Sequence, residues 1–150
     1  MANEARRLAC IALVIPVLSA CGDSSEPSKP EFTGSPEEQI AKTVNAMFAA
    51  WNAGDGELTC SYLTEDGRNW VLKYVPQFPF LEEEIDPDSC EDAVEMSRAA
   101  TEGTYGQHAA AQRVQINPDG TASVHSRFRG AVTLREVDGE WLIEVPYFFD

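Results

Sequence analysis

Basic residues and histidines are scarce in this sequence. Its 150 residues include 11 Lys and Arg against 25 Asp and Glu, which gives a net charge of −14. This acidity argues against binding to nucleic acid and against adhesion to anionic lipid through surface charge. The two histidines, His108 and His125, have no third ligand at a spacing typical of zinc sites. The sequence therefore predicts no metal centre, and we expect no cofactor.

A hydrophobic run long enough to cross a membrane is also missing. The longest apolar run covers residues 8–18. It is shorter than the roughly 20 residues that a bilayer requires, and it contains Pro16. Arg6 and Arg7 precede it and small residues follow it, an order typical of a secretory signal. Residues 1–20 are therefore predicted to be a signal peptide that is removed on export.

The end of this signal, Leu18-Ser19-Ala20-Cys21, resembles the lipobox of bacterial lipoproteins. The resemblance implies cleavage between Ala20 and Cys21 and a diacylglyceryl group on the Cys21 thiol. Two acyl chains hold a protein firmly on a bilayer without a transmembrane helix. The mature protein would then be exported and anchored through Cys21 to the outer face of the bacterial cell membrane. The alternative is an ordinary secretory signal that is cut nearby, with Cys21 incidental.

Only two of the four cysteines remain for the folded part of the chain. Cys10 leaves with the signal peptide and Cys21 carries the lipid, so Cys60 and Cys90 are left in an oxidising compartment. A disulfide between them is the natural interpretation. Two buried free thiols are the alternative. A metal site is less favoured, because neither cysteine has a His or Cys partner at ligand spacing.

Composition divides the mature chain into a tether and one domain. Residues 21–34 are rich in Ser, Pro, Gly and charge and are predicted to be a flexible, lipid-anchored tether. Residues 35–150 have the size of a single domain with one core. The sequence shows no internal repeats.

The domain begins with a strong helix signal. Ser35 can cap this helix, Glu38 completes a capping box, and Gly54 suits its end. Apolar residues recur at helical spacing and form one stripe, made of Ile40, Val44, Met47, Phe48 and Trp51.

Two further helices are predicted, with an ambiguous segment between them. Asp55 can cap a second, shorter helix that carries Leu58, Tyr62 and Leu63 and that Asp66-Gly67 is expected to interrupt. Residues 69–80 are compatible with either a short helix or an edge strand. Asp86-Pro87 predicts the start of a third helix. Its inner face would comprise Cys90, Ala93, Val94 and Ser97.

After Ala110 the apolar residues alternate with polar ones, as in strands. Turn sequences at residues 117–120 and at Asp138-Gly139 join consecutive runs. Helices followed by an antiparallel meander predict an α+β domain with the helices on one face of the sheet. The expected strands cover residues 112–117, 121–129, 131–137 and 140–149.

Three segments resemble the nuclear-transport-factor-2-like, or ketosteroid-isomerase-like, superfamily. They are residues 48–55, which end in Ala-Gly-Asp, then Cys60-Ser61-Tyr62-Leu63, and the final turn and strand at residues 137–143. The resemblance implies a cone-shaped α+β fold in which a curved sheet wraps a long helix and can leave a pocket. A cysteine pair in this position also resembles small lipoproteins of the superfamily. Enzymes, binding modules and assembly domains share this fold, so the fold does not determine the function.

The pocket that the resemblance implies would be lined mainly by aromatic residues. An isomerase-type site needs an Asp base beside an oxyanion donor. On the predicted strands no carboxylate faces inward, because Glu144 lies opposite the apolar face and Glu136 adjoins a turn. We therefore predict no catalytic residues and no turnover of model steroid, ester or lactone substrates. The expected lining is Phe48, Trp51, Tyr62, Tyr74, Phe128, Trp141 and Tyr147.

Two charged clusters have simpler interpretations than ligand binding. The acidic residues between 82 and 92 lack the glycine and the bidentate Glu of a calcium loop, and a solvated loop leading into a helix is favoured. Arginines on neighbouring strands could hold an anionic ligand, but ion pairs with nearby glutamates are favoured. These arginines are Arg113, Arg127, Arg129 and Arg135.

The leading hypothesis for function is a membrane-tethered, non-catalytic module of the bacterial envelope that binds an envelope protein or a small apolar ligand. One alternative is an enzyme of isomerase or hydrolase type that uses the cone pocket. The other is a structural or assembly domain that dimerises through its sheet.

Overall fold

The computed structural model describes residues 29–78, 81, 86–101, 111, 113–125 and 131–145. In this part of the chain, helices come first and strands follow. The elements are α1 (Pro36–Ala53), α2 (Gly56–Ser61), α3 (Glu65–Tyr74), the 3₁₀ helix η1 (Val75–Gln77), α4 (Cys90–Thr101), β1 (Arg113–Ile116), β2 (Thr121–His125), β3 (Ala131–Val137) and β4 (Glu140–Val145).

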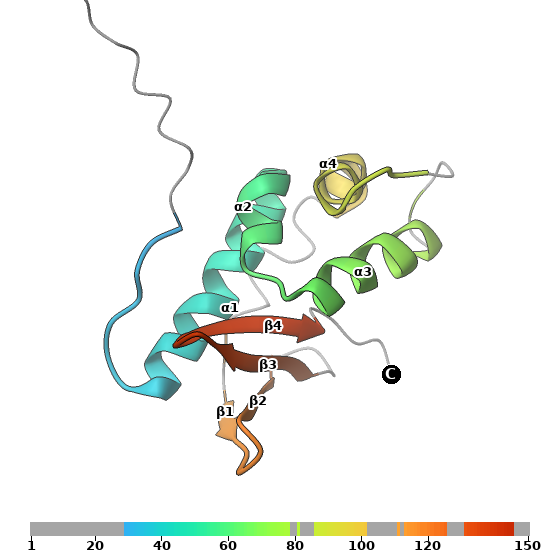
Figure 1. Cartoon of the computed structure of the whole chain (residues 1–150). Helices are drawn as coiled ribbons and strands as arrows, with labels where there is room; N and C mark the ends of the chain where they lie inside the picture. The colour runs from blue at the N-terminus through green and yellow to red at the C-terminus, as the bar shows by residue number, and fades with distance from the viewer. Residues whose placement is uncertain are drawn as a thin grey trace, which may run out of the picture.

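The strands form one antiparallel sheet in the order β1-β2-β3-β4. The helix α1 packs against β1, β2 and β4, and α3 packs against β4 (Figure 1). The remaining helices, α2 and α4, contact α1 and each other. The predicted α+β class, with N-terminal helices packed on a curved antiparallel sheet, is confirmed.

The first helix forms as the sequence predicts. The Ser35 hydroxyl accepts a hydrogen bond from the Glu38 amide at 3.3 Å, and the Glu38 carboxylate accepts one from the Ser35 amide at 3.3 Å. This capping box satisfies two amides that the first turn would leave unpaired. Gly54 ends the helix with a φ of 72°, a left-handed conformation that glycine adopts without strain. The whole predicted apolar stripe is buried.

Between α1 and α3, the structure differs from the predicted second helix, which is shorter than expected. Asp55 caps α2 as expected, since its carboxylate accepts from the Leu58 amide at 2.9 Å. The helix stops at Ser61, however, and the next residues run beside β4. There the Tyr62 carbonyl accepts from the Ile143 amide at 2.9 Å, which pairs the chain with the sheet instead of continuing the helix.

Gly67 does not interrupt a helix, because it lies inside α3. The Thr64 hydroxyl caps α3 and accepts from the Gly67 amide at 3.1 Å. A Cβ atom at residue 67 would collide with the Ile143 carbonyl oxygen, so glycine is needed where α3 packs against β4. The glycine therefore serves close packing, whereas the sequence pattern suggested a break.

The ambiguous segment at residues 69–80 is helical as far as it is described. It continues α3 to Tyr74 and then forms η1, which ends at Gln77. The predicted start of the third helix at Asp86-Pro87 is wrong by a few residues, because α4 begins at Cys90. Its cap is Ser89, whose hydroxyl accepts from the Asp92 amide at 3.1 Å. The predicted inner face of this helix is buried, as expected.

The strands begin where the sequence predicts, within one residue. Residues 131–137 match β3 at both ends. The predicted second and fourth strands extend past the described residues, so their far ends remain predictions. At the hairpin between β3 and β4, Asp138 and Gly139 both have positive φ, 52° and 85°. That combination is typical of the type I′ turn that Asp-Gly favours.

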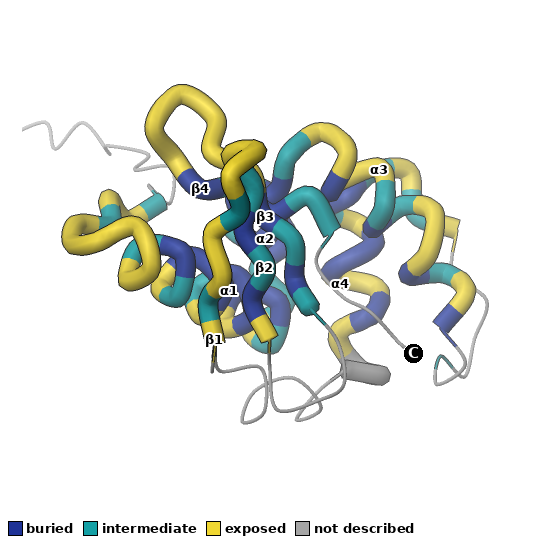
Figure 2. Tube along the Cα trace, turned by 90° about the horizontal axis from the view of Figure 1, so that it is seen from below, coloured by how far each residue is buried: buried dark blue, intermediate teal, exposed yellow. Residues whose placement is uncertain are grey.

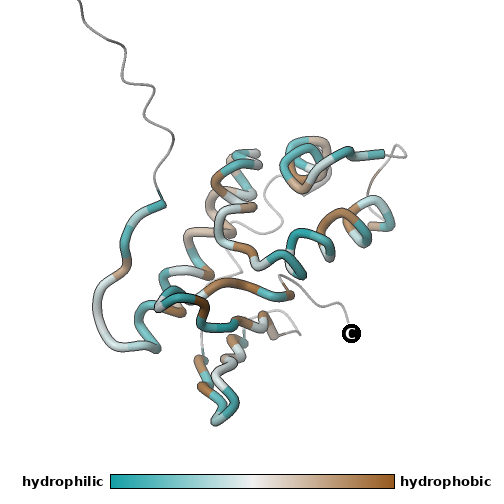
Figure 3. The backbone as a smooth tube through the Cα atoms, in the orientation of Figure 1, coloured by the Kyte–Doolittle hydropathy of each residue, from teal (hydrophilic) through white to brown (hydrophobic). Residues whose placement is uncertain are grey.

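The core lies between the inner face of the sheet and the helices. Figure 2 shows buried segments where the strands and helices face each other and exposed turns at the rim, and Figure 3 shows apolar and hydrophilic residues alternating along both kinds of element. Ala122, Val124, Leu134 and Ile143 supply the sheet side and are almost fully buried. The predicted disulfide is present: the Sγ atoms of Cys60 and Cys90 are bonded and join α2 to α4.

Candidate functional site

The aromatic residues expected to line a cone pocket lie mostly in the core. Phe48, Trp51, Tyr62 and Trp141 belong to one cluster of buried, mutually packed side chains. Tyr74 is 38% exposed and stacks beside Trp70 on α3, with the ring centroids 5.1 Å apart. Phe128 and Tyr147 lie outside the described residues. Of the predicted lining, Trp141 also borders a hollow, which is described below.

The polar candidates on the strands lie on the surface or form an ion pair. His125 and Glu136 are exposed. The Glu144 carboxylate pairs with the Arg135 guanidinium on the outer face of the sheet, which confirms the ion-pair interpretation for Arg135. Among the described residues, no group of three His, Cys, Asp or Glu side chains could hold a metal ion. His108, Arg127 and Arg129 lie outside the described part.

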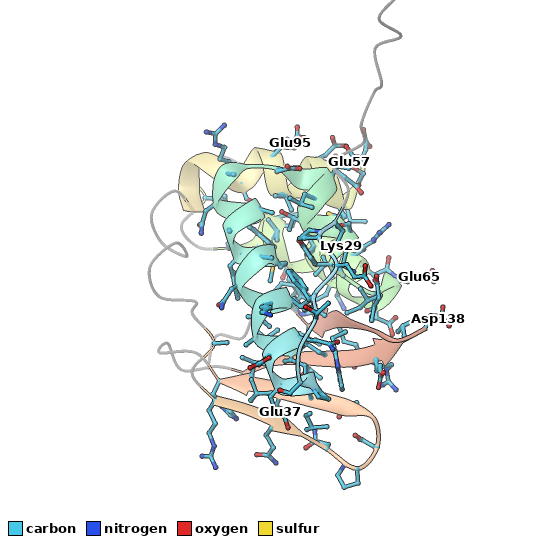
Figure 4. All side chains as sticks on the ribbon, turned by 90° about the vertical axis from the view of Figure 1, so that its left-hand side faces the viewer. Lys29, Glu37, Glu57, Glu65, Glu95 and Asp138 are labelled. Atoms are coloured by element: carbon cyan, nitrogen blue, oxygen red, sulfur yellow. A yellow bond between two sulfur atoms is a disulfide. The ribbon has the colours of Figure 1, made fainter. Side chains whose placement is uncertain are left out.

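Part of the predicted tether lies against the domain. We call residues 29–34 the strap; it runs beside α1 (Figures 1 and 4). Two side chains of α1 donate hydrogen bonds to its backbone: Gln39 Nε2 to the Gly34 carbonyl at 3.0 Å and Lys42 Nζ to the Thr33 carbonyl at 2.8 Å. Flexibility of residues 21–34 stays a prediction, but the strap has defined contacts.

Two strap side chains contact the domain more specifically. The Lys29 ammonium lies 2.7 Å from a Glu140 carboxylate oxygen and 5.3 Å from the centre of the Tyr62 ring. The Phe32 ring stacks on the Tyr62 ring, with 6.3 Å between the two centroids and an angle of 12° between the ring planes. We call the surface formed by Gln39, Lys42, Tyr62 and Glu140 the strap site.

These contacts are individually weak. Glu140 is mostly exposed, so its ion pair contributes at most about 1 kcal/mol. A cation over an aromatic ring at such a site contributes about 0.5–1 kcal/mol. Phe32 adds the burial of part of its ring against the core. The strap is therefore held by several contacts that each contribute little.

The electrostatics of the strap site favour a cation. Tyr62 follows α2. The pKa of its hydroxyl is raised above the ordinary value, mainly by burial and to a smaller extent by the negative charge of Asp55. The π face of the Tyr62 ring attracts a cation. The Glu140 carboxylate supplies the opposite charge at hydrogen-bond distance. Together they form a two-point contact for an ammonium or guanidinium group.

A hollow of about 530 Å³ adjoins the strap site. The strap borders one side of it, and Gln39, Thr43 and the β3–β4 turn border the other. Three carboxylates, those of Glu31, Asp138 and Glu140, belong to its lining residues. The hollow therefore extends the strap site with acidic space next to the Trp141 ring.

Another hollow, of about 460 Å³, lies between the start of α3 and the β3–β4 hairpin. It is lined by Leu63, Thr64, Glu65, Arg68, Val137 and Leu142. The Arg68 side chain is engaged with α2, since its Nε donates to the Cys60 carbonyl at 3.0 Å. No segment of the described chain occupies this hollow in the way that the strap occupies its site.

Sequence reasoning missed both strap residues. The signal for them was present: Phe32 is the one aromatic residue in an otherwise polar stretch, and Lys29 is the only cation there. A lone aromatic residue in a tether is a candidate for contact with the domain. Its partner could not be identified, because Lys29 and Glu140 lie 111 residues apart in the sequence.

No known protein-family model matches this chain, and no curated protein matches it significantly. Among the helices that the structure describes, none combines the length and the apolar character that a membrane span needs.

Proposed function

We propose that the protein is an exported lipoprotein whose domain is a non-catalytic binding module of the bacterial envelope. The support for the anchor is the order of cations, apolar run, small residues and Cys21 at the N-terminus. The lipid on Cys21 would hold the protein at the outer face of the cell membrane, and the domain would bind another envelope protein.

The observation that carries the binding function is the occupied strap site. A surface that holds one chain segment by carbonyl hydrogen bonds, an ion pair and ring stacking has the chemistry to hold another. Half of the residues that line the adjoining hollow belong to the strap, and its domain side, formed by Gln39, Thr43 and residues 138–141, would remain available to a segment that replaces the strap. Interfaces of this kind combine a buried aromatic anchor with a polar rim.

Site-specific photo-crosslinking in intact cells tests this function. A photoreactive amino acid at Asp138 stands on the exposed β3–β4 turn and borders the hollow from the domain side. The matched control is Glu95, an exposed glutamate on α4 that lies well apart from Asp138 in Figure 4. We expect a discrete adduct with one envelope protein from position 138 and none from position 95. Absence of an adduct at position 138, or the same adducts from both positions, would contradict the proposal.

A further inference from the structure

The strap site recognises backbone as well as side chains. Gln39 and Lys42 lie three residues apart on α1 and therefore on one face of the helix. They donate to the carbonyls of two consecutive residues, Gly34 and Thr33. Every peptide presents such carbonyls, but Gly34 has a φ of 126° and a Cβ atom there would collide with the Glu38 carboxylate. These two donors therefore accept the backbone of a segment that has glycine at this place.

The side-chain contacts add selectivity for charge and shape. Lys29 places its ammonium between Glu140 and the Tyr62 ring, and Phe32, three residues later, stacks on the same ring. A segment that binds in the same way needs a cation followed at that spacing by an aromatic ring. A small apolar molecule would leave the Gln39 and Lys42 side-chain donors and the Glu140 carboxylate without protein partners.

Charge complementarity also points to a basic occupant. The chain has a net charge of −14. On the domain side of the strap site, the β3–β4 turn carries Asp138 and Glu140, and Asp55 acts on Tyr62. The cation on this side, Lys42, is engaged with a strap carbonyl. An acidic surface of this kind attracts a cationic partner and repels an acidic one.

We propose that the strap site binds an extended cationic segment of an envelope protein, in which a Lys or Arg replaces Lys29 and an aromatic ring replaces Phe32. This inference rests on the proposed binding function and specifies the class of its partner. The strap is then a built-in competitor. Because the strap belongs to the same chain, its effective concentration is high, and the partner must displace it.

A peptide with the sequence of residues 28–34 is the probe for this proposal. Fluorescence anisotropy measures its binding to the mature, lipidated full chain in detergent. A strap that is docked for about nine-tenths of the time lowers the apparent affinity about tenfold. The double variant Lys29→Ala, Phe32→Ala should therefore bind the labelled peptide about ten times more tightly than the wild-type chain. The same peptide with glutamate in place of its lysine should bind to neither.

Glu140→Gln isolates the electrostatic part of the site. This side chain is exposed, so the substitution leaves the core unchanged. Added to the double variant, it should weaken peptide binding about fivefold and reduce the dependence of binding on salt concentration. Glu95→Gln is the matched control, and it should change neither. If loss of Phe32 prevents folding, as judged by the thermal transition, Lys29→Ala alone should still raise the peptide affinity.

Equal peptide affinity for the wild-type and strap variants, or no effect of Glu140→Gln, would overturn this proposal. The crosslink from position 138 would be untouched by either result, so the binding function can survive without this proposal. A wild-type chain that dimerises in solution, and loses the dimer with Glu140→Gln, would assign the site to the strap of a second copy. That result would also overturn the proposal.

Discussion

Removal of the Cys60–Cys90 disulfide should destabilise the domain strongly. The bridge closes a loop between residues 30 positions apart. In the chain-entropy model, a loop of about 30 residues lowers the entropy of the unfolded chain by about 12 cal/mol/K, or about 3.6 kcal/mol at 25 °C. Both cysteines are buried, and replacement of both by alanine leaves a small cavity that costs about 1 kcal/mol more. The expected loss is therefore about 4–5 kcal/mol.

The structure explains why this bridge matters locally. The helix α2 has six residues, too few to be stable alone. It is held to α4 by the disulfide and by the close approach of Gly56 to the Glu91 backbone. Since domains of this size have a free energy of unfolding of about 5–15 kcal/mol, the double variant should be close to the limit of stability.

Urea unfolding followed by circular dichroism measures the loss. The mature chain with Cys21→Ala serves as the soluble parent, and Cys60→Ala with Cys90→Ala is compared with it. Reduction of the parent by dithiothreitol should produce most of the same loss without any mutation. A difference below about 1 kcal/mol between bridged and unbridged proteins would refute the reasoning, because chain entropy alone predicts more.

Three further predictions use the same unfolding assay. Gly56→Ala should cost about 1–3 kcal/mol, because its Cβ would lie 2.6 Å from the Glu91 carbonyl oxygen; an unchanged midpoint would contradict this contact. Ser35→Ala should cost about 1 kcal/mol through loss of the helix cap, and a neutral result would argue against the capping box. Hydrogen bonds from the hydroxyl and the amide of Thr121 lower the pKa of Asp119. The charged carboxylate therefore stabilises the fold at pH values above its ordinary pKa of about 4, and this contribution is lost as the pH falls through the lowered pKa. Asp119→Asn should lower the stability at neutral pH and match the parent in strong acid.

The parts of the fold that the sequence predicts are those fixed by neighbouring residues. The first helix has its cap, its apolar stripe and its terminal glycine within one continuous segment. The hairpin between β3 and β4 is determined by Asp138-Gly139, which favours a tight turn. Residues 131–137 are predictable as one strand because Val132 and Leu134 alternate with polar residues and because Asp138-Gly139 marks its end.

The errors occur where distant contacts decide between local alternatives. Glycine is typical of a helix break, but at residue 67 the lack of a side chain lets α3 approach β4 closely. Asp86 and Ser89 are both residues that can cap a helix, and the bond between Cys90 and Cys60 on α2 favours the start at Ser89. The end of α2 is set by the pairing of Tyr62 with Ile143, 81 residues later in the sequence.

The candidate site is harder to predict than the fold, for the same reason. Its parts come from the strap, α1, the residue after α2 and the β3–β4 turn. No pattern within any of these segments indicates the others. Four of the aromatic residues that the sequence suggested as a pocket lining fill the core instead, because the same apolar character suits both roles; they are Phe48, Trp51, Tyr62 and Trp141.

The most direct test of the account is the mass of the mature N-terminus. The protein extracted from membranes should yield an N-terminal peptide that begins at Cys21 and carries a diacylglyceryl group, and Cys21→Ala should leave an uncleaved precursor or release the protein from the membrane fraction. An unmodified N-terminus elsewhere, together with a Cys21→Ala protein that is processed and fractionates as the wild type does, would contradict the proposal of a lipid-anchored envelope protein.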